Sequence, residues 1–282
     1  MLYWLASFSD AISSQPIYRY VTFRAVGAMI TALALMRLLG PAMLASLCRR
    51  RISGTRSAGA IMVAMLLAAT LLWAKPINSY VWIAVGVVLA FGAGELVGEC
   101  WSGRRSALLQ DAWIAISATA ASLACFAVAS QTSTPPPFAT PAGSIVDVGW
   151  LHVALGAFVI VAAGQIVKTA DRAYGSVFGT LLIAAYALML TAHLVGNSFF
   201  SQYLGLRYVP AAAELAVLCG AAIGAGIGFL WLNGRGTSTS IGDAASLALG
   251  GMLGTVAVAT KSEIVLALIC CLFVLKPACV RG

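Results

Sequence analysis

Charged side chains are scarce in this sequence. Asp, Glu, Lys and Arg make up 9% of the 282 residues, whereas hydrophobic residues make up 61% and the mean hydropathy is +0.95. A soluble globular domain carries roughly 25% charged residues, so the deficit excludes a sizeable soluble domain. The sequence predicts an all-α integral membrane protein. At about 20 apolar residues per crossing helix, the chain has room for roughly nine or ten crossings.

Residue patterns typical of metal or redox centres are also missing. The seven cysteines show no Cys-x-x-Cys spacing, and several lie inside apolar runs, where cysteine behaves as a small hydrophobic residue. The two histidines, His152 and His193, fall in or beside apolar runs, so we expect them to be packed or interfacial. Residues 1–19 lack a basic start, which predicts an extracytoplasmic interfacial segment rather than a cleavable signal peptide.

The hydrophobic runs predict one membrane domain over residues 1–282, with a transmembrane bundle of about nine helices across 20–279. The connections are short, and the longest, SQTSTPPPFATPAGS at 130–144, is expected to be a stiff extracytoplasmic connector. The predicted spans are 20–46, 58–74, 80–100, 111–129, 149–167, 175–196, 211–232, 245–260 and 263–279.

The basic residues predict an N-out, C-in orientation. With the N-terminus outside, twelve Lys and Arg residues fall on the cytoplasmic side and five outside, as the positive-inside rule requires. The net charge of +8 therefore indicates contact with anionic lipid headgroups, and no nucleic-acid partner is expected. The twelve are Arg37, Arg49, Arg50, Arg51, Arg56, Arg104, Arg105, Lys168, Arg172, Arg235, Lys276 and Arg281.

Glycines recur at helical spacing in two late spans. Such spacing on one helix face lets a neighbouring backbone approach closely, and it predicts a compact bundle rather than a wide pore. The glycines are Gly220, Gly224 and Gly228 in one span, and Gly250, Gly251 and Gly254 in the next.

Several longer stretches resemble one known family. They are MLYWLASFSD, YRYVTFRAVGAMITAL, LLWAKPINSYVW, SFFSQYLGLRYVPAAAEL, AELAVLCGAAIGAGIGFLWLN and IGDAASLALGGMLGTVAVATKSEIVLAL. Together they are similar to the phospho-N-acetylmuramoyl-pentapeptide translocase (MraY) family of polyprenyl-phosphate sugar-1-phosphate transferases. The resemblance covers most of the chain apart from 103–148.

The resemblance implies a function and a place. Members of that family work in the bacterial inner membrane, in peptidoglycan biosynthesis. They transfer a phosphosugar from a UDP-linked muramoyl pentapeptide to undecaprenyl phosphate, release UMP, and use Mg²⁺ held by carboxylates of the cytoplasmic loops. The family has ten helices. Here the ninth apolar run ends where the family continues into a histidine-bearing loop, so we expect the tenth helix to be lacking.

The family's paired aspartates align with Gly98 and Glu99 of FGAGELVGECW. Glu95 lies one helical turn before Glu99, so both carboxylates share one helix face. They form either a substitute metal pair or two acids reaching towards headgroup water, and the second interpretation is favoured.

In GQIVKTADRAYG, Asp171 matches the first aspartate of the family's nucleotide segment, whereas Tyr174 replaces the second. Gln165 and Lys168 stand where the family has asparagines. By resemblance Gln165 and Lys168 bind substrate, together with Asn233 and Thr55, whereas Asp171 is catalytic together with Glu99 and Asp243. Tyr174 and Lys168 put the nucleotide site in doubt.

Two further segments keep parts of the family's site. Asn233 matches a family asparagine, and Asp243 matches a metal-binding aspartate; Asp243 serves equally well as a helix cap. The family's uracil-stacking Phe is absent between them. Thr55 survives from the family's first cytoplasmic motif, in RRRISGTRSAGAIM.

Three interpretations stay open. The favoured one is a degenerate, catalytically impaired member that binds polyprenyl lipid or pairs with a full-length homologue; the family's dimers also suggest a homodimer. The second is an active Mg²⁺-dependent transferase whose rebuilt site uses Glu95, Glu99, Asp171 and Asp243. The third is a carrier or channel, which intramembrane charges usually mark.

Overall fold

The computed structural model describes residues 20–49, 54–100, 104–131, 137–139, 145–147, 151–174, 178–206, 208–233 and 241–280. Within these ranges nine helices have at least 18 residues, and each overlaps one predicted span. They are α2 (Val21–Arg49), α3 (Gly54–Trp73), α4 (Ser79–Cys100), α5 (Arg104–Gln131), α6 (Leu151–Tyr174), α7 (Phe178–Val195), α9 (Leu215–Asn233), α10 (Asp243–Thr260) and α11 (Glu263–Val280).

The membrane class is confirmed by these helices. Over the described residues, six of them are long and apolar enough to cross a bilayer, and α3 and α4 contain shorter apolar runs. The exact number of crossings and the orientation stay predictions. The predicted interfacial segment at residues 1–19 lies outside the described residues.

Within the described residues four short elements join the long helices, and the two that are strands were not predicted. The helix α8 (Ser198–Tyr203) and the 3-10 turn η2 (Ala212–Glu214) lie between α7 and α9. The strands β1 (Pro137–Ala139) and β2 (Ile145–Asp147) pair antiparallel, with Phe138 opposite Val146. The connector after α5 therefore folds back on itself, because aromatic and β-branched residues on both sides favour pairing.

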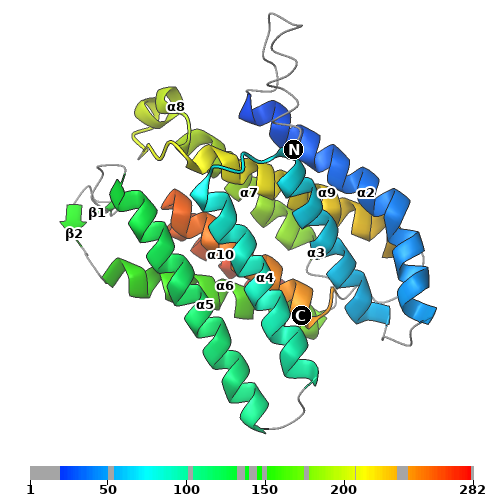
Figure 1. Ribbon diagram of the computed structural model, residues 1–282. Coiled ribbons are helices and arrows are strands. Elements are labelled where there is room, and N and C mark those ends of the chain that lie inside the picture. The colour runs from blue at the N-terminus through cyan, green and yellow to red at the C-terminus, as the bar shows by residue number, and fades with distance from the viewer. Residues whose placement is uncertain are drawn as a thin grey trace, which may run out of the picture.

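Two helices form the centre of the bundle. In α10 every residue from Ala245 to Thr260 is buried, and 78% of the α9 span is buried, compared with 22–39% for the four outer spans. A helix that is hydrophobic on all sides is buried either in a protein core or in lipid: α9 and α10 occupy the core, and the exposed apolar faces of the outer helices meet lipid. Figure 1 shows α10 behind α4 and α5, and α2 running beside α9.

The glycine prediction is confirmed in both pairs of helices. A Cβ atom on Gly224 would lie 2.0 Å from the carbonyl oxygen of Met29 in α2. On Gly250 it would lie 2.6 Å from the carbonyl oxygen of Ala163 in α6. No real Cβ tolerates such distances, so these glycines are what bring α2 onto α9 and α6 onto α10.

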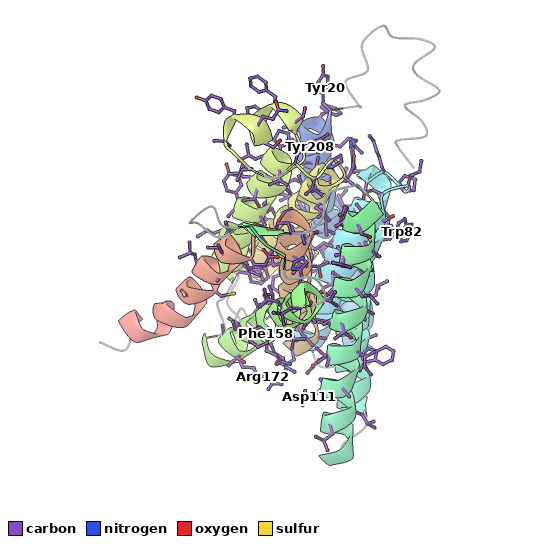
Figure 2. The ribbon with its side chains drawn as sticks, turned by 90° about the vertical axis from the view of Figure 1, so that its left-hand side faces the viewer. Tyr20, Trp82, Asp111, Phe158, Arg172 and Tyr208 are labelled. Carbon is purple, nitrogen blue, oxygen red and sulfur yellow. The ribbon has the colours of Figure 1, made fainter. Side chains whose placement is uncertain are left out.

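The two ends of the bundle differ in chemistry. Tyr20, Trp82 and Tyr208 lie at one end, and Asp111 and Arg172 lie at the other (Figure 2). Tyr and Trp are typical of membrane–water interfaces. We name the first end the outer end and the second the inner end, following the predicted orientation.

The outer end contains a buried ion pair between distant segments. A guanidinium nitrogen of Arg24 in α2 donates to Glu214 of η2 at 2.8 Å, and Arg24 is 2% exposed. The ammonium of Lys75 lies 3.7 Å from the same carboxylate. Arg24 and Glu214 neutralise each other, which lets α2 pack on the start of α9 without an unpaired arginine inside the protein.

Candidate functional site

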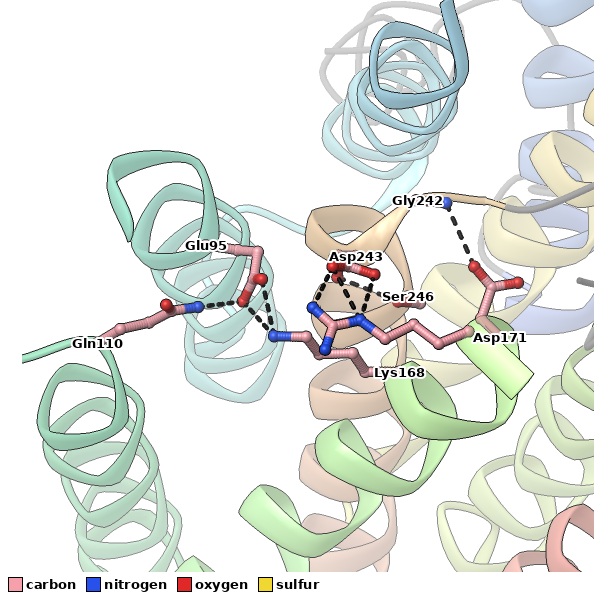
Figure 3. A network of polar contacts seen from close by, with 8 residues as sticks. Glu95, Gln110, Lys168, Asp171, Gly242, Asp243 and Ser246 are labelled. Carbon is pink, nitrogen blue, oxygen red and sulfur yellow. Dashed lines mark hydrogen bonds and ion pairs between the residues drawn. The ribbon is translucent and has the colours of Figure 1, made fainter. Parts of the chain in front are cut away.

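The inner end brings together acidic residues from three helices. Glu95 comes from α4, Asp171 from α6 and Asp243 from the first turn of α10 (Figure 3). The close contact of α6 with α10 at Gly250 positions the inner end of α6 beside α4 and α10. Helix α5 is held against α4 because the Trp113 ring covers Gly94, and this places Gln110 beside Glu95.

Glu95 is engaged by a lysine. The Lys168 ammonium lies 2.7 Å from each of the two Glu95 carboxylate oxygens, and the Gln110 amide also donates to Oε2. The side chains of Lys168 and Glu95 are only 11% and 4% exposed. The pair is therefore buried and hydrogen-bonded at both oxygens, which is the condition under which a buried charge pair persists.

Asp243 of α10 is bound by Arg172, which lies on α6 one turn after Lys168. Arg172 Nε donates to both carboxylate oxygens at 2.9 Å, and a terminal guanidinium nitrogen also contacts Oδ2. The Arg172 side chain is 59% exposed and that of Asp243 is 25% exposed. This pair is open to solvent, so water and salt weaken it far more than they weaken the buried pair.

Asp171 holds the backbone that precedes α10. Its carboxylate accepts hydrogen bonds from the backbone N–H groups of Ile241 at 3.1 Å and Gly242 at 3.3 Å. Gly242 has a φ of 90°, a conformation that glycine adopts without strain. Asp171 thus fixes the backbone that leads into α10, and this backbone determines where the Asp243 side chain points.

These acids do not fit a magnesium ion as they stand. Mg²⁺ requires oxygen ligands at about 2.1 Å in octahedral geometry. The oxygens of Glu95 and Asp243 already face a lysine and an arginine, and those of Asp171 face backbone amides. Among the described residues, no three His, Cys, Asp or Glu side chains gather in a way that could hold a metal ion.

The other predicted site residues are only partly described. Thr55 is in the first turn of α3, Glu99 is one turn beyond Glu95 in α4, and Asn233 ends α9, but their side chains lie outside the described residues. Gln165 is a half-buried residue of α6, one turn before Lys168. Asp243 is the first residue of α10, but the N-cap position that the capping interpretation gave it is held by Gly242, and the Asp243 carboxylate faces Arg172.

Sequence reasoning missed two members of the site. Gln110 was not singled out, and Arg172 was counted only among the topology-setting basic residues. Arg172 follows Lys168 by four residues, a spacing that puts both cations on one face of α6. That spacing was the available signal; Gln110 had none, because its role depends on how α5 packs against α4.

An apolar groove runs along the lipid-facing side of α6. It lies between α6 and α11 and has a volume of about 440 Å³. Figure 2 shows the end of α11 diverging from the other helices. The groove is lined mainly by hydrophobic side chains, among them Phe158, Ala162, Ile166, Leu266, Ala267 and Cys270.

Both histidines are away from the inner acids. His152 is buried at the outer end of α6, where Lys261 contacts its Nε2 atom. His193 is half-buried near the end of α7, with its ring centre 6.5 Å from that of Phe200. The expectation that both are packed or interfacial agrees with these positions.

A bundle of long apolar helices with a charged site at one end defines a polytopic integral membrane protein. No protein-family model matches the chain. Two proteins from Rhodopseudomonas palustris, strains BisB18 and BisA53, are 38% and 37% identical to it over 98% of its length and 83% of theirs. Both are named phospho-N-acetylmuramoyl-pentapeptide-transferase.

The chain therefore belongs to the phospho-N-acetylmuramoyl-pentapeptide-transferase family. The matches cover nearly the whole chain, so the similarity extends beyond the predicted range, which left out residues 103–148. The relatives are bacterial, which together with the apolar helices indicates a multi-pass bacterial membrane protein.

Proposed function

We propose that this protein is a polyprenyl-phosphate-binding member of the family, located in the bacterial inner membrane, in which phosphosugar transfer is impaired. One observation carries the proposal: each of the three described inner acids is already held by a cation or by backbone amides of the protein itself.

Phosphoryl transfer between two anionic substrates depends on neutralising and positioning their phosphates. In this protein the carboxylates that would hold a metal are bound internally, and the cations that would hold phosphate are bound to those carboxylates. The chain keeps charged residues of the kind that bind phosphate and metal, but here the cations and the carboxylates pair with one another.

The α6–α11 groove supports the lipid part of the proposal. An isoprenoid chain is apolar, and its burial against apolar side chains contributes roughly 25 cal/mol per Å² of area removed from solvent. Helix α6 lines the groove and also carries Arg172 at its inner end. Because the Arg172–Asp243 pair is exposed, a lipid phosphate can replace Asp243 there at small cost, whereas the buried Lys168–Glu95 pair stays closed.

Lipid binding is tested with the purified chain in detergent, titrated with undecaprenyl phosphate and followed by native mass spectrometry. We expect saturable binding that Ala267→Trp reduces at least tenfold, because the indole fills the groove that Ala267 lines. Leu268→Trp is the matched control: Leu268 is the next residue of α11, 66% exposed and outside the groove lining. Equal affinity for the two variants would contradict the groove as the lipid site.

Transfer is tested separately, by UMP release from UDP-muramoyl pentapeptide and undecaprenyl phosphate with Mg²⁺ or Mn²⁺. We expect release no faster than that of a Glu95→Gln plus Asp243→Asn variant. Faster release by the unaltered chain would support the active transferase with a rebuilt site instead.

A further inference from the structure

The inner end carries the same positive charge that a divalent cation would bring. Lys168 and Arg172 are one helical turn apart on α6, and each lies on the carboxylate of a different neighbouring helix, Glu95 of α4 and Asp243 of α10. The Lys168 ammonium and the Arg172 guanidinium, both from α6, therefore lie where the resemblance implies one Mg²⁺ ion bound by several segments.

The geometry at Glu95 is that of an ion seated on a carboxylate. The Lys168 nitrogen is equidistant, at 2.7 Å, from both oxygens, and Gln110 completes the hydrogen bonding of Oε2. A metal ion approaching those oxygens would have to displace an ammonium that is itself almost fully buried. The displaced charge would remain next to the metal, and the two cations would repel each other strongly at low dielectric.

Asp243 and Asp171 complete the arrangement. Arg172 binds both oxygens of Asp243 through its Nε atom, and the backbone at Ile241 and Gly242 donates to Asp171. With Glu95, Asp171 and Asp243 set against Lys168 and Arg172, the five described charges sum to minus one. The site is close to neutral without any added ion.

We infer that Lys168 and Arg172 take the place of a divalent cation in this protein, tying α4 and α10 to α6, and that the resting site binds no Mg²⁺. This inference concerns the same site as the proposed function. Its test measures only metal binding, so neither lipid nor nucleotide is added. Failure of lipid binding or detection of turnover would leave the metal measurement unaffected.

The test uses Mn²⁺ as a paramagnetic probe of the full chain in nonionic detergent, at constant ionic strength. Free and bound Mn²⁺ are counted by electron paramagnetic resonance. The unaltered chain is expected to show no saturable Mn²⁺ binding beyond that of Glu95→Gln. Its apparent melting temperature is expected to be the same in EDTA and in MgCl₂.

The Lys168→Gln plus Arg172→Gln variant exposes the acids and is expected to gain stoichiometric Mn²⁺ binding, which a further Glu95→Gln substitution removes. Arg37→Gln is the matched control, because Arg37 packs over Trp231 at 4.6 Å and its loss removes a cation elsewhere in the bundle. The control is expected to gain no binding.

Two results would overturn the inference. One is saturable Mn²⁺ binding by the unaltered chain that Asp243→Asn abolishes; Asp243 belongs to the exposed pair, so this comparison leaves the buried Lys168–Glu95 pair intact. The other is a folded Lys168→Gln plus Arg172→Gln variant that still binds no Mn²⁺, since the acids would then form no metal site even without their cations.

Discussion

At the scale of single residues, the two inner ion pairs differ mainly in burial. Lys168 and Glu95 are removed from solvent, whereas Arg172 and Asp243 remain in contact with it. Removing one partner of a buried pair leaves an uncompensated charge, which costs about 3–5 kcal/mol. An exposed pair contributes only about 0–1 kcal/mol.

We therefore expect Lys168→Met to lower the free energy of unfolding by about 3 kcal/mol or more. Combining it with Glu95→Leu should restore most of the loss, because no charge is then left buried. The measurement is reversible unfolding of the purified protein in detergent. Arg172→Met is the control, and its expected loss is below about 1 kcal/mol. Equal losses for Lys168→Met and Arg172→Met would show that burial does not separate the two pairs.

The acids of the site could be placed from the sequence, but their partners could not. Glu95, Asp171 and Asp243 were assigned to the inner end from their positions beside apolar runs and from the family resemblance. Whether each faces a metal, water or a cation depends on the rotation and separation of α4, α6 and α10. Those follow from packing at glycines such as Gly250, which no local pattern encodes at the precision of a hydrogen bond.

At the scale of helices, contact between α2 and α9 depends on the absence of side chains. The Cβ of an alanine at position 224 would lie 2.0 Å from a backbone oxygen of α2, and backbone cannot rotate away as a flexible side chain can. The helices would have to separate along part of their length and lose the dispersion contacts that hold them together in lipid.

Gly224→Ala is expected to destabilise the protein by about 1–3 kcal/mol, as overpacking of a tight interior usually does. Gly86→Ala is the matched control, because a Cβ there meets nothing within 4 Å. It should be neutral or stabilising by about 0.5–1 kcal/mol, because alanine loses less conformational entropy than glycine when the helix forms. Thermal unfolding of both variants in the same detergent tests the difference; a stable Gly224→Ala protein would contradict the close contact.

The helices were predictable because lipid imposes a simple rule. A run of about 20 apolar residues must form a helix to satisfy its backbone hydrogen bonds, and each predicted span overlaps one observed helix. Helix ends were less predictable: α5 begins at Arg104, whereas the apolar run begins near 111. The β1–β2 pair was missed because two three-residue strands give too short a pattern to separate from a loop.

At the scale of the whole molecule, orientation is set by the distribution of basic residues. Twelve of the seventeen Lys and Arg residues gather on one predicted side, and Tyr20, Trp82 and Tyr208 lie at the opposite end of the bundle (Figure 2). Both features are governed by the membrane rather than by packing inside the protein.

Reporter fusions test the orientation. A green fluorescent protein fused after residue 282 should fluoresce, because it folds on the cytoplasmic side. Alkaline phosphatase inserted between residues 132 and 136 should be active, because that connector is predicted to be outside. The reverse pattern would invert the assigned outer and inner ends, and activity of both reporters at both positions would indicate mixed insertion.

The ion pair between Arg24 and Glu214 has a consequence for how the chain is made. The two residues are 190 positions apart, and Arg24 is almost fully enclosed in the finished protein. At about 5–20 residues per second, roughly 10–40 s pass between synthesis of the arginine and synthesis of its glutamate. Throughout that interval helix α2 carries the Arg24 charge before Glu214 has been made. It must wait near the headgroups or the insertion machinery, so the outer end of the bundle can close only once the start of α9 has been translated.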